Sequence, residues 1–478
     1  MRFKDKLNMI DQNNIKKFEV TSDELYDLLQ KKESLLLFDL RLQETYNAGH
    51  INGAVHAVCD VRTKDTIMPK IPKNIKLILI DDDGIMSEET TKMMRSFGLD
   101  AHYLQGGMKS WHKEVIEGNP TATIKPDDLW KKLQNPKLFL LDVRDADEFS
   151  DFKIPGSVNI SLKDLFKPEN ISKIPKDKEI VTVCPHGNRA MVATFALARN
   201  GIKSNVLEGG LAGWSQVLNA VKVAENPTVI QVEKVGKGCL SHIVISGDEA
   251  IVIDPLYPPE KYLEIAKQEN VKITKIIDTH QHADHVSAAP ELANMSGSLV
   301  YESNLEVWDR TSNFLDDGQI MTFGTSKIRV IHTPGHTPGS LSYVVNEKYV
   351  FTGDILFIES IGRPDLRDNA EEFAEQLYNS LHSKLLNLPL DTIVFPTHHG
   401  IFVIPENRVY STTIEKAKKH NVLTLSKEEF VKQVVSVTVP RPMNYQKIIQ
   451  INKGSMPLVK TDIPDLELGP NRCSITGE

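Results

Sequence analysis

The sequence is poor in cysteine and has no long apolar run. Its four cysteines, Cys59, Cys184, Cys239 and Cys473, match no CxxC metal motif and are too few for a disulfide framework in a chain of 478 residues. We therefore expect free thiols in a reducing compartment, with the cytoplasm as the default. No stretch of about 18 apolar residues could span a membrane, and the first residues lack the apolar core of a signal peptide.

The chain also lacks an excess of basic residues. Lysine and arginine number 56 against 64 acidic residues, which gives a formal net charge of -8. Non-specific nucleic-acid binders carry the opposite balance, so we expect no nucleic-acid partner. With roughly 150 residues per domain, a length of 478 residues predicts about three domains.

An internal repeat organises the N-terminal part of the sequence. Residues 35–111 match residues 138–214 without a gap, at a constant offset of 103 (138 − 35). Trp111, for example, pairs with Trp214. Both copies alternate short apolar strands with helical stretches, which predicts one small α/β domain with a parallel sheet per copy.

The two copies differ at the loop that follows the central strand. The second copy reads CPHGNR over residues 184–189, whereas the first reads DDDGIM over residues 81–86. Backbone N–H groups and a helix N-terminus converge in such a loop, which predicts a low-pKa thiolate at Cys184. Arg189 adds a positive charge for an anionic sulfur donor. A buried structural thiol is the alternative for Cys184, and the first copy, which has neither group, is expected to be catalytically silent.

Both copies resemble rhodanese domains over residues 18–218, and CPHGNR resembles the CxxGxR active loop of that sulfurtransferase family. The resemblance implies that Cys184 carries a persulfide and that Arg189 is part of its cradle. We place the silent rhodanese-like domain at residues 1–118 and the active one at residues 119–222. Packing or positioning is the expected role of the silent copy.

Histidine and aspartate gather in one short segment of the C-terminal half. An apolar strand runs directly into THQHADH, which places His280, His282, Asp284 and His285 on a loop at its carboxyl end. A single histidine is more often a hydrogen-bonded structural residue, but HxHxDH is very improbable by chance. The segment therefore predicts a metal site.

Further ligands are expected from distant strand ends. His336, Asp354 and His398 each follow an apolar run and a turn-forming residue. Together, His280, His336 and Asp354 supply two imidazoles and a carboxylate, a set that suits non-haem iron(II) with three open positions. Alternatively, all seven side chains bind two metal ions in a hydrolase.

Residues 229–455 resemble the metallo-β-lactamase fold, an αββα sandwich, and within it the persulfide dioxygenase branch. The resemblance rests on THQHADH, TPGHTPGS, FTGD, IGRPDL and LTLSKEEFVKQV. It implies one Fe(II) ion per chain, held by His280, His336 and Asp354. It further implies that four side chains hydrogen-bond around this centre or bind a second metal, and that one arginine contacts the substrate beside the iron; they are His282, Asp284, His285, His398 and, for the substrate, Arg363.

The remaining C-terminal features carry less functional signal. We place the metal domain at residues 223–455 and a polar C-terminal tail at residues 456–478. Cys239 is interpreted as a core thiol, and Cys473 has no assigned role. Val422 stands where many glutathione-using relatives have an arginine, so the thiol carrier is open between glutathione, coenzyme A and another small thiol.

Together these features predict an α/β multidomain enzyme that handles sulfur. The iron centre would convert a low-molecular-weight persulfide, O₂ and water into a thiol and sulfite. Cys184 would exchange sulfane sulfur with sulfite or thiosulfate, in a direction that the sequence leaves open. The alternatives are a glyoxalase II-like thioester hydrolase with two zinc ions and a non-catalytic scaffold. We also expect a homo-oligomer without a membrane partner.

Overall fold

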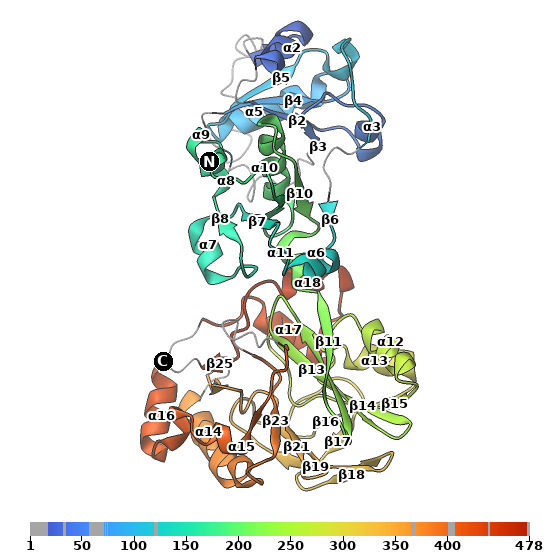
Figure 1. Cartoon of the computed structure of the whole chain (residues 1–478), viewed down its shortest axis with the longest axis vertical. Helices are drawn as coiled ribbons and strands as arrows, with labels where there is room; N and C mark the ends of the chain where they lie inside the picture. Colours follow the sequence, from blue (N-terminus) through green and yellow to red (C-terminus); the bar gives the residue numbers. More distant parts are fainter. Residues whose placement is uncertain are drawn as a thin grey trace. The chain divides into compact units, whose positions relative to one another are not determined.

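The computed structural model describes residues 18–31, 35–56, 71, 73, 75–118, 123–365, 369–399, 407–437 and 440–475 (Figure 1). Cys59 lies outside the described residues. Within these ranges, no helix combines the length and the apolar character needed to cross a lipid bilayer. The chain divides into two compact units, Met1–Gly213 and Trp214–Glu478.

Two parallel five-stranded sheets form the first unit. The first sheet has the strand order β1 (Glu19–Val20), β5 (Asp100–Leu104), β4 (Lys76–Ile80), β2 (Leu35–Asp39), β3 (Ala54–His56). The second sheet has the strand order β6 (Thr123–Ile124), β10 (Ser204–Leu207), β9 (Glu179–Val183), β7 (Leu138–Asp142), β8 (Val158–Asn159). The two orders correspond strand for strand, and β2 and β7 begin at the sequence offset of 103 (138 − 35). The predicted α/β architecture of both copies is confirmed.

The helices of the first unit also follow the repeat. The first copy contains α2 (Ser22–Gln30), α3 (Gln43–Ala48), α5 (Ile85–Ser96) and the 3₁₀ turn η4 (Gly107–Ser110). The second contains α6 (Pro126–Lys132), α7 (Ala146–Asp151), α8 (Leu162–Leu165), α9 (Pro168–Ile171), α10 (Asn188–Arg199) and α11 (Gly210–Trp214). Helices α5 and α10 start after Gly84 and Gly187, whose φ angles of 91° and 95° are accessible to glycine without strain.

One hydrophobic core joins the two copies. Phe38 and Leu79 of the first sheet belong to the same buried cluster as Leu141 of the second sheet and Phe195 of α10. Because each small sheet covers part of the other's apolar surface, the silent copy contributes directly to the stability of the active one.

Two mixed sheets form the second unit. The first has the order β11 (Leu218–Ala224), β12 (Thr228–Lys234), β13 (Cys239–Ser246), β14 (Glu249–Ile253), β15 (Lys272–Ile277), β16 (Leu299–Ser303), β17 (Asn313–Leu315). The second has the order β18 (Ile320–Phe323), β19 (Ser326–His332), β20 (Leu341–Val345), β21 (Tyr349–Phe351), β23 (Ile393–Phe395), β24 (Thr412–Thr413). A short ribbon pairs β22 (Ile361–Gly362) with β25 (Ser474–Ile475).

Helices cover the outer faces of both sheets. Figure 1 shows α12 (Glu260–Gln268) and α13 (Ala289–Ser296) beside β14 and β15, and α14 (Ala370–Ser383), α15 (Ile414–Ala417) and α16 (Lys427–Ser436) on the opposite side. Along β14, Ile251 and Ile253 join the core between the sheets, whereas Ala250 and Val252 join the core under α12 and α13. This alternation follows from the two-residue period of a strand. The predicted αββα sandwich is confirmed.

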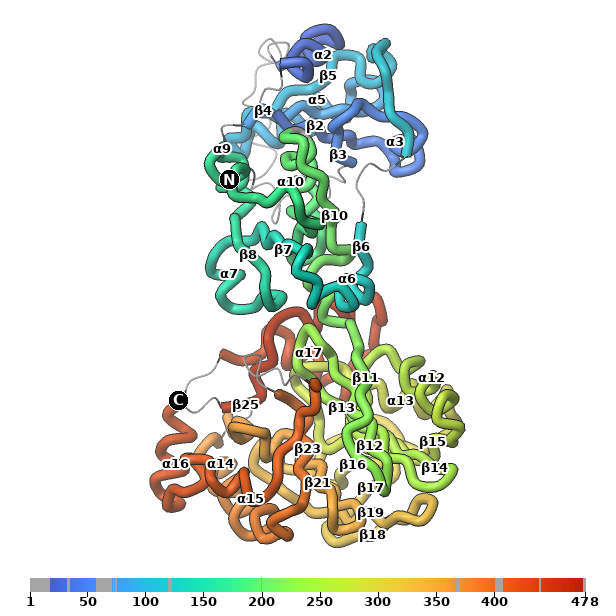
Figure 2. The backbone as a smooth tube through the Cα atoms, in the orientation of Figure 1, coloured from blue at the N-terminus to red at the C-terminus, as the bar shows by residue number. Residues whose placement is uncertain are grey.

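The limits of the second unit differ from those expected. Strand β11 pairs with β12, so the unit begins ahead of residue 223. The residues from 456 onward fold into it rather than forming a tail. They contain η7 (Lys460–Asp462), α18 (Ile463–Leu466) and β25, and together with η5 (Leu385–Asn387), η6 (Asn421–Thr424) and α17 (Tyr445–Lys453) they complete the domain. Figure 2 traces this last segment through α17 to β25, and its residues Glu467 and Cys473 are fully buried.

Candidate functional site

Three side chains from different strand ends converge in the second unit. His280 follows β15, His336 follows β19 and Asp354 follows β21. The Nε2 atoms of His280 and His336 lie 3.6 and 3.3 Å from Asp354 Oδ2. All three side chains are buried. The structure thus brings together the three residues that the sequence singles out as ligands of one metal ion.

Each of these three side chains has a hydrogen-bond partner at one polar atom, while its other polar atom has none. The hydroxyl of the preceding threonine lies 2.9 Å from His280 Nδ1, and the carbonyl oxygen of Arg363 lies 2.8 Å from His336 Nδ1. Asp354 Oδ1 lies 2.7 Å from His398 Nδ1. The remaining atoms, His280 Nε2, His336 Nε2 and Asp354 Oδ2, are buried without a hydrogen-bond partner. Metal-binding side chains are typically oriented by a hydrogen bond at the atom that does not bind the metal. The three residues therefore fit a bound metal ion.

The protonation of two of these groups also suits metal binding. Burial lowers the pKa of His336 to about 4. Burial raises the pKa of the Asp354 carboxyl, but the neighbouring His398 and His280 lower it by more, so that it lies well below its usual range. A neutral imidazole and an ionised carboxylate are the forms that coordinate a metal.

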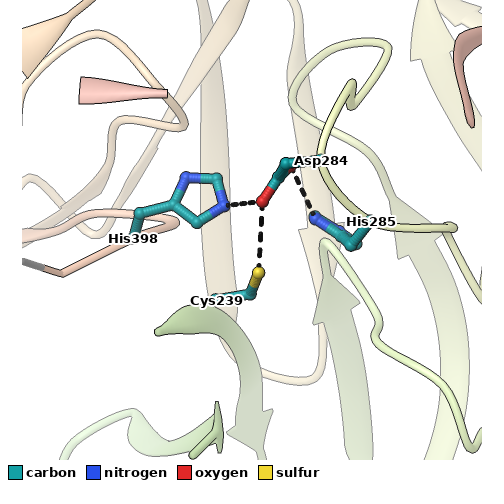
Figure 3. Close-up of side chains that lie close together, drawn as sticks. All are labelled: Cys239, Asp284, His285 and His398. Atoms are coloured by element: carbon teal, nitrogen blue, oxygen red, sulfur yellow. Dashed lines mark hydrogen bonds and ion pairs between the residues drawn. The ribbon is translucent and has the colours of Figure 1, made fainter. Parts of the chain in front are cut away.

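A second group of donors lies beside the first (Figure 3). Asp284 stands at its centre, with His398 Nε2 and Cys239 Sγ at 2.8 and 3.2 Å from Oδ2 and His285 Nδ1 at 3.1 Å from Oδ1. All four side chains are buried. Burial, and then the charge of Asp284, raise the pKa of the Cys239 thiol to about 12. Cys239 is therefore a protonated core thiol, as interpreted from the sequence, but it lies within a metal-competent cluster.

The second histidine of the HxHxDH segment has a different partner. His282 Nε2 lies 3.1 Å from Asp254 Oδ1, and His282 groups with Asp254 and Asp278 rather than with either cluster above. The same Asp254 carboxylate accepts hydrogen bonds from the N–H and hydroxyl of Thr279 and from the hydroxyl of Thr397. Asp254 thereby fixes the backbone next to His280 and His398. Asp254 is not among the residues predicted from the sequence, although it directly follows the apolar strand EAIVI.

Arg363, which is expected to contact the substrate, has hydrogen-bond partners within the protein. Its guanidinium forms two hydrogen bonds of 2.7 Å to Asp365 and one of 3.0 Å to each of the carbonyls of Pro440 and Arg472. Only 1 % of the residue is exposed. Because the cation is satisfied by protein groups, the contribution of Arg363 to the centre is its carbonyl oxygen, which orients His336.

In the first unit, Cys184 lies in a nest of backbone N–H groups. Its Sγ accepts hydrogen bonds of 3.2 and 3.3 Å from the N–H of Gly187 and Ala190. Burial nevertheless raises the pKa of the thiol, against the N–H groups and Arg189, which lower it. The expected low-pKa thiolate is not found, because desolvation outweighs these groups. The nest still provides the donors that would stabilise negative charge on sulfur.

Arg189, the last residue of this loop, forms an ion pair with Glu148 of α7. Its guanidinium forms a bidentate ion pair with Glu148, with hydrogen bonds of 2.8 and 2.7 Å. The pair fixes the start of α10 against α7 and keeps a positive charge near Cys184. Arg189 therefore acts on the sulfur through its charge and through the shape of the loop.

In the equivalent loop of the first copy, the side chain of Asp81 takes the position that Cys184 has in the second copy. Asp81 accepts hydrogen bonds of 2.7 and 3.1 Å from the N–H of Gly84 and Ser87, which stand at the repeat positions of Gly187 and Ala190. It also accepts from the N–H of Met86 and from the hydroxyl of Ser87. The carboxylate thus occupies the place of the sulfur. This arrangement explains the predicted silence of the copy better than a missing cysteine alone.

Replacing Asp81 with alanine is expected to lower the free energy of unfolding by about 3 kcal/mol, because three backbone donors lose their acceptor. Urea unfolding of the full chain, followed on the first unit, measures this loss. The exposed neighbour Asp82 provides the control, since Asp82→Ala should change stability by less than about 0.5 kcal/mol. Equal stability of the two variants would contradict a structural role for the Asp81 carboxylate.

Comparison with known proteins agrees with this geometry. The rhodanese-like domain family matches residues 21–114 and 125–217, and the metallo-beta-lactamase superfamily matches residues 236–306 and 295–398. The mitochondrial persulfide dioxygenase ETHE1 of Bos taurus is 31% identical over 208 residues, which cover 43% of this chain and 78% of that protein. The chain belongs to the metallo-beta-lactamase superfamily. Two rhodanese-like domains precede its metallo-beta-lactamase domain.

Other metallo-beta-lactamase relatives have different names. The hydroxyacylglutathione hydrolase of Pseudoalteromonas translucida is 30% identical over 231 residues, which cover 48% of this chain and 83% of that protein. The crystal structure of ETHE1 from Myxococcus xanthus is 26% identical, with a TM-score of 0.42, and covers 50% of this chain and 99% of that one.

Two residues near the end of the metallo-beta-lactamase domain hydrogen-bond the backbone of the loop that carries the HxHxDH segment. Asn452 of α17 donates hydrogen bonds of 2.9 Å to the carbonyls of both His282 and His285. Glu467 accepts a hydrogen bond of 2.8 Å from the N–H of Val286. No local pattern marks these two residues in the sequence, because their partners lie far away along the chain.

Cys473 also reaches the site from this last segment. It is fully buried, and its candidate ligand atom lies within 4.8 Å of those of Asp354 and His398. The pairing of β25 with β22 carries it there, and its carbonyl accepts a hydrogen bond of 3.0 Å from the N–H of Arg363. No pattern in the sequence connects this thiol with the metal ligands.

Proposed function

We propose that the chain is an iron-dependent persulfide dioxygenase coupled to a rhodanese sulfurtransferase. The convergence of His280, His336 and Asp354, each with one free donor atom, carries the proposal. The overall reaction is RSSH + O₂ + H₂O → RSH + SO₃²⁻ + 2 H⁺. Sulfane sulfur loses four electrons and O₂ accepts four, so the reaction is balanced. The similarity to persulfide dioxygenases supports this choice of substrate class.

The protein side chains determine which metal positions stay open. A ferrous ion held by two imidazoles and one carboxylate supplies the redox chemistry that joins oxygen to sulfur. The partners behind the ligands keep both imidazole rings and the carboxylate in a fixed orientation. Burial of the three ligands excludes bulk water and strengthens their electrostatic interaction with a bound cation.

In the second rhodanese-like domain, Cys184 is the sulfur carrier of the proposal. Sulfite attacks the terminal sulfur of a Cys184 persulfide, forms the new S–S bond of thiosulfate and releases the Cys184 thiolate. The reverse reaction loads Cys184 from thiosulfate and releases sulfite. In either direction, the N–H groups of Gly187 and Ala190 stabilise the charge that develops on Cys184 Sγ.

A thioester hydrolase with two zinc ions is the second candidate. The hydroxyacylglutathione hydrolase relatives favour it, and Asp284, His285 and His398 offer donors for a second ion. Against it, His282 does not belong to the metal-competent group of His280, His336 and Asp354, and its Nε2 is held by Asp254. A first metal site that uses only three residues supports an open iron centre over a dinuclear zinc site.

Metal analysis and oxygen uptake test the proposal. The full chain is purified anaerobically, loaded with Fe(II), and given glutathione persulfide or coenzyme A persulfide. We expect about one iron per chain and one sulfite formed for each O₂ consumed. Comparing the two persulfides identifies the carrier. Two zinc ions per chain with turnover of an acylglutathione thioester, and no persulfide-dependent uptake, would instead establish the hydrolase.

A further inference from the structure

The second donor group has every side chain that a second metal ion would need. Asp284, His285 and His398 lie together, and His285 Nε2 is buried without a hydrogen-bond partner. His398 connects the two groups, because its Nδ1 faces Asp354 and its Nε2 faces Asp284. A missing ligand therefore cannot limit the domain to one ion.

A buried thiol belongs to this second group of donors. Cys239 Sγ donates a hydrogen bond of 3.2 Å to Asp284 Oδ2, the same oxygen that lies 2.8 Å from His398 Nε2 (Figure 3). The thiol hydrogen points at the carboxylate oxygen that a second ion would bind. Asp284 Oδ2 thus already has two partners within the protein.

The backbone fixes Cys239 in this position. Cys239 forms an isolated antiparallel bridge with His398, and the N–H of Leu240 donates a hydrogen bond of 2.6 Å to the carbonyl of Thr397. On the other side, the N–H of His399 donates to the carbonyl of Gly238 at 3.0 Å. Because both flanking residues are bonded to the segment that carries His398, the backbone of Cys239 is held beside that histidine.

The spacing of the donors separates the two groups. Nitrogen and oxygen ligands at about 2.0 Å from a tetrahedral zinc ion lie about 3.3 Å from one another. In the first group, the distances from Asp354 Oδ2 to His336 Nε2 and His280 Nε2 are 3.3 and 3.6 Å. In the second, His398 Nε2 lies only 2.8 Å from Asp284 Oδ2, which is a hydrogen-bond distance. His398 Nε2 and Asp284 Oδ2 are thus held at hydrogen-bond distance, whereas the donors of the first group lie further apart.

We propose that Cys239 limits the domain to one metal ion by hydrogen-bonding Asp284 and occupying the second donor group. This inference rests on the proposed function only in taking His280, His336 and Asp354 as the metal centre. Cys239 is thus a residue that determines metal stoichiometry, and through it the choice between single-ion oxidation and two-ion hydrolysis.

Zinc titration of the full chain and its Cys239→Ala variant tests the proposal. We expect one tightly bound ion in the unsubstituted chain and two in the variant, with the second bound at least about tenfold more tightly than any second ion in the unsubstituted chain. Cys184→Ser, which removes a thiol from the other unit, should behave like the unsubstituted chain. Adding Asp284→Asn to Cys239→Ala should restore one ion and so locate the second one.

Two results would overturn the proposal. One is a Cys239→Ala variant that folds and still binds a single ion. The other is an unsubstituted chain that binds two ions and loses one on substitution, because Cys239 would then be a ligand. If the Cys239→Ala variant does not fold, a cobalt(II) titration of the unsubstituted chain tests the proposal instead. A sulfur-to-cobalt charge-transfer band that Cys239→Ser removes would contradict the proposal, and its absence supports it.

Failure of this inference and failure of the proposed function are distinguishable. The ion counts depend on the donor groups alone and need no persulfide or oxygen. A chain with one ion and no oxygen uptake would contradict the dioxygenase and leave the role of Cys239 intact. A chain that takes up oxygen, but whose Cys239→Ala variant binds the same number of zinc ions, would contradict the role of Cys239 and leave the dioxygenase intact.

Discussion

The His280→Ala variant is expected to lose its iron and, with it, persulfide-dependent oxygen uptake. Among the described residues, His280 supplies one of the three donor atoms of the first group, and His336 Nε2 and Asp354 Oδ2 cannot replace it. We expect iron affinity to fall by more than about 100-fold, since substitution of residues that merely orient ligands already costs 10- to 100-fold. Iron content after desalting and the initial rate at an oxygen electrode measure both losses.

His332→Ala is the matched control in the same domain. His332 ends β19 close to His336 in the sequence, but its Nε2 lies 2.8 Å from the carbonyl oxygen of Pro338 and it belongs to neither donor group. This variant should keep about one iron per chain and most of the oxygen uptake. If His280→Ala kept both its iron and its activity, the assignment of the centre would be wrong.

The Cys184→Ser variant is expected to lose sulfur transfer while oxygen uptake continues. A serine hydroxyl cannot form the persulfide, although it fits the same nest of N–H groups. Transfer from thiosulfate to cyanide, which releases sulfite and thiocyanate, should fall by more than about 1,000-fold, as expected when a nucleophile is removed. Thiocyanate formation measures this rate directly.

The two variants serve as controls for each other. His280→Ala should retain thiocyanate formation, and Cys184→Ser should retain persulfide oxidation by its metal centre, because the two sites belong to separate compact units. Sulfur transfer that survived in Cys184→Ser would place the activity on another thiol. Loss of both activities in both variants would show that the chain works only as a coupled unit.

Much of the fold could be predicted because its signals are local or repeated. The gapless match at an offset of 103 (138 − 35) is enough to predict two domains with the same architecture, and β2 and β7 begin at that offset. Alternating apolar residues and turn formers predict most strands of the sandwich. The segment after residue 456 is not recognisable as part of the domain because β25 has only two residues, and its partner β22 lies more than a hundred residues earlier along the chain.

The site could be predicted in part for a similar reason. Ligands at strand ends, such as His280 and Asp354, are visible because a strand and a turn former precede them. The orienting groups are not visible: Asp254 acts across a sheet, and Glu467 and Asn452 act from the last helices. The pKa of Cys184 was misjudged because the sequence reveals the N–H nest but not the burial that opposes it.

The support of the metal loop by Asn452 and Glu467 has a consequence for the order of biosynthesis. Every residue proposed to hold the iron leaves the ribosome before the helix and the segment that brace the HxHxDH loop. Because chains emerge from the N-terminus and their domains fold as units, the nascent chain displays the histidines before it can fix their geometry. Insertion of the metal into a braced centre therefore requires synthesis of the chain to residue 467 or beyond, when the two preceding rhodanese-like domains can already be folded.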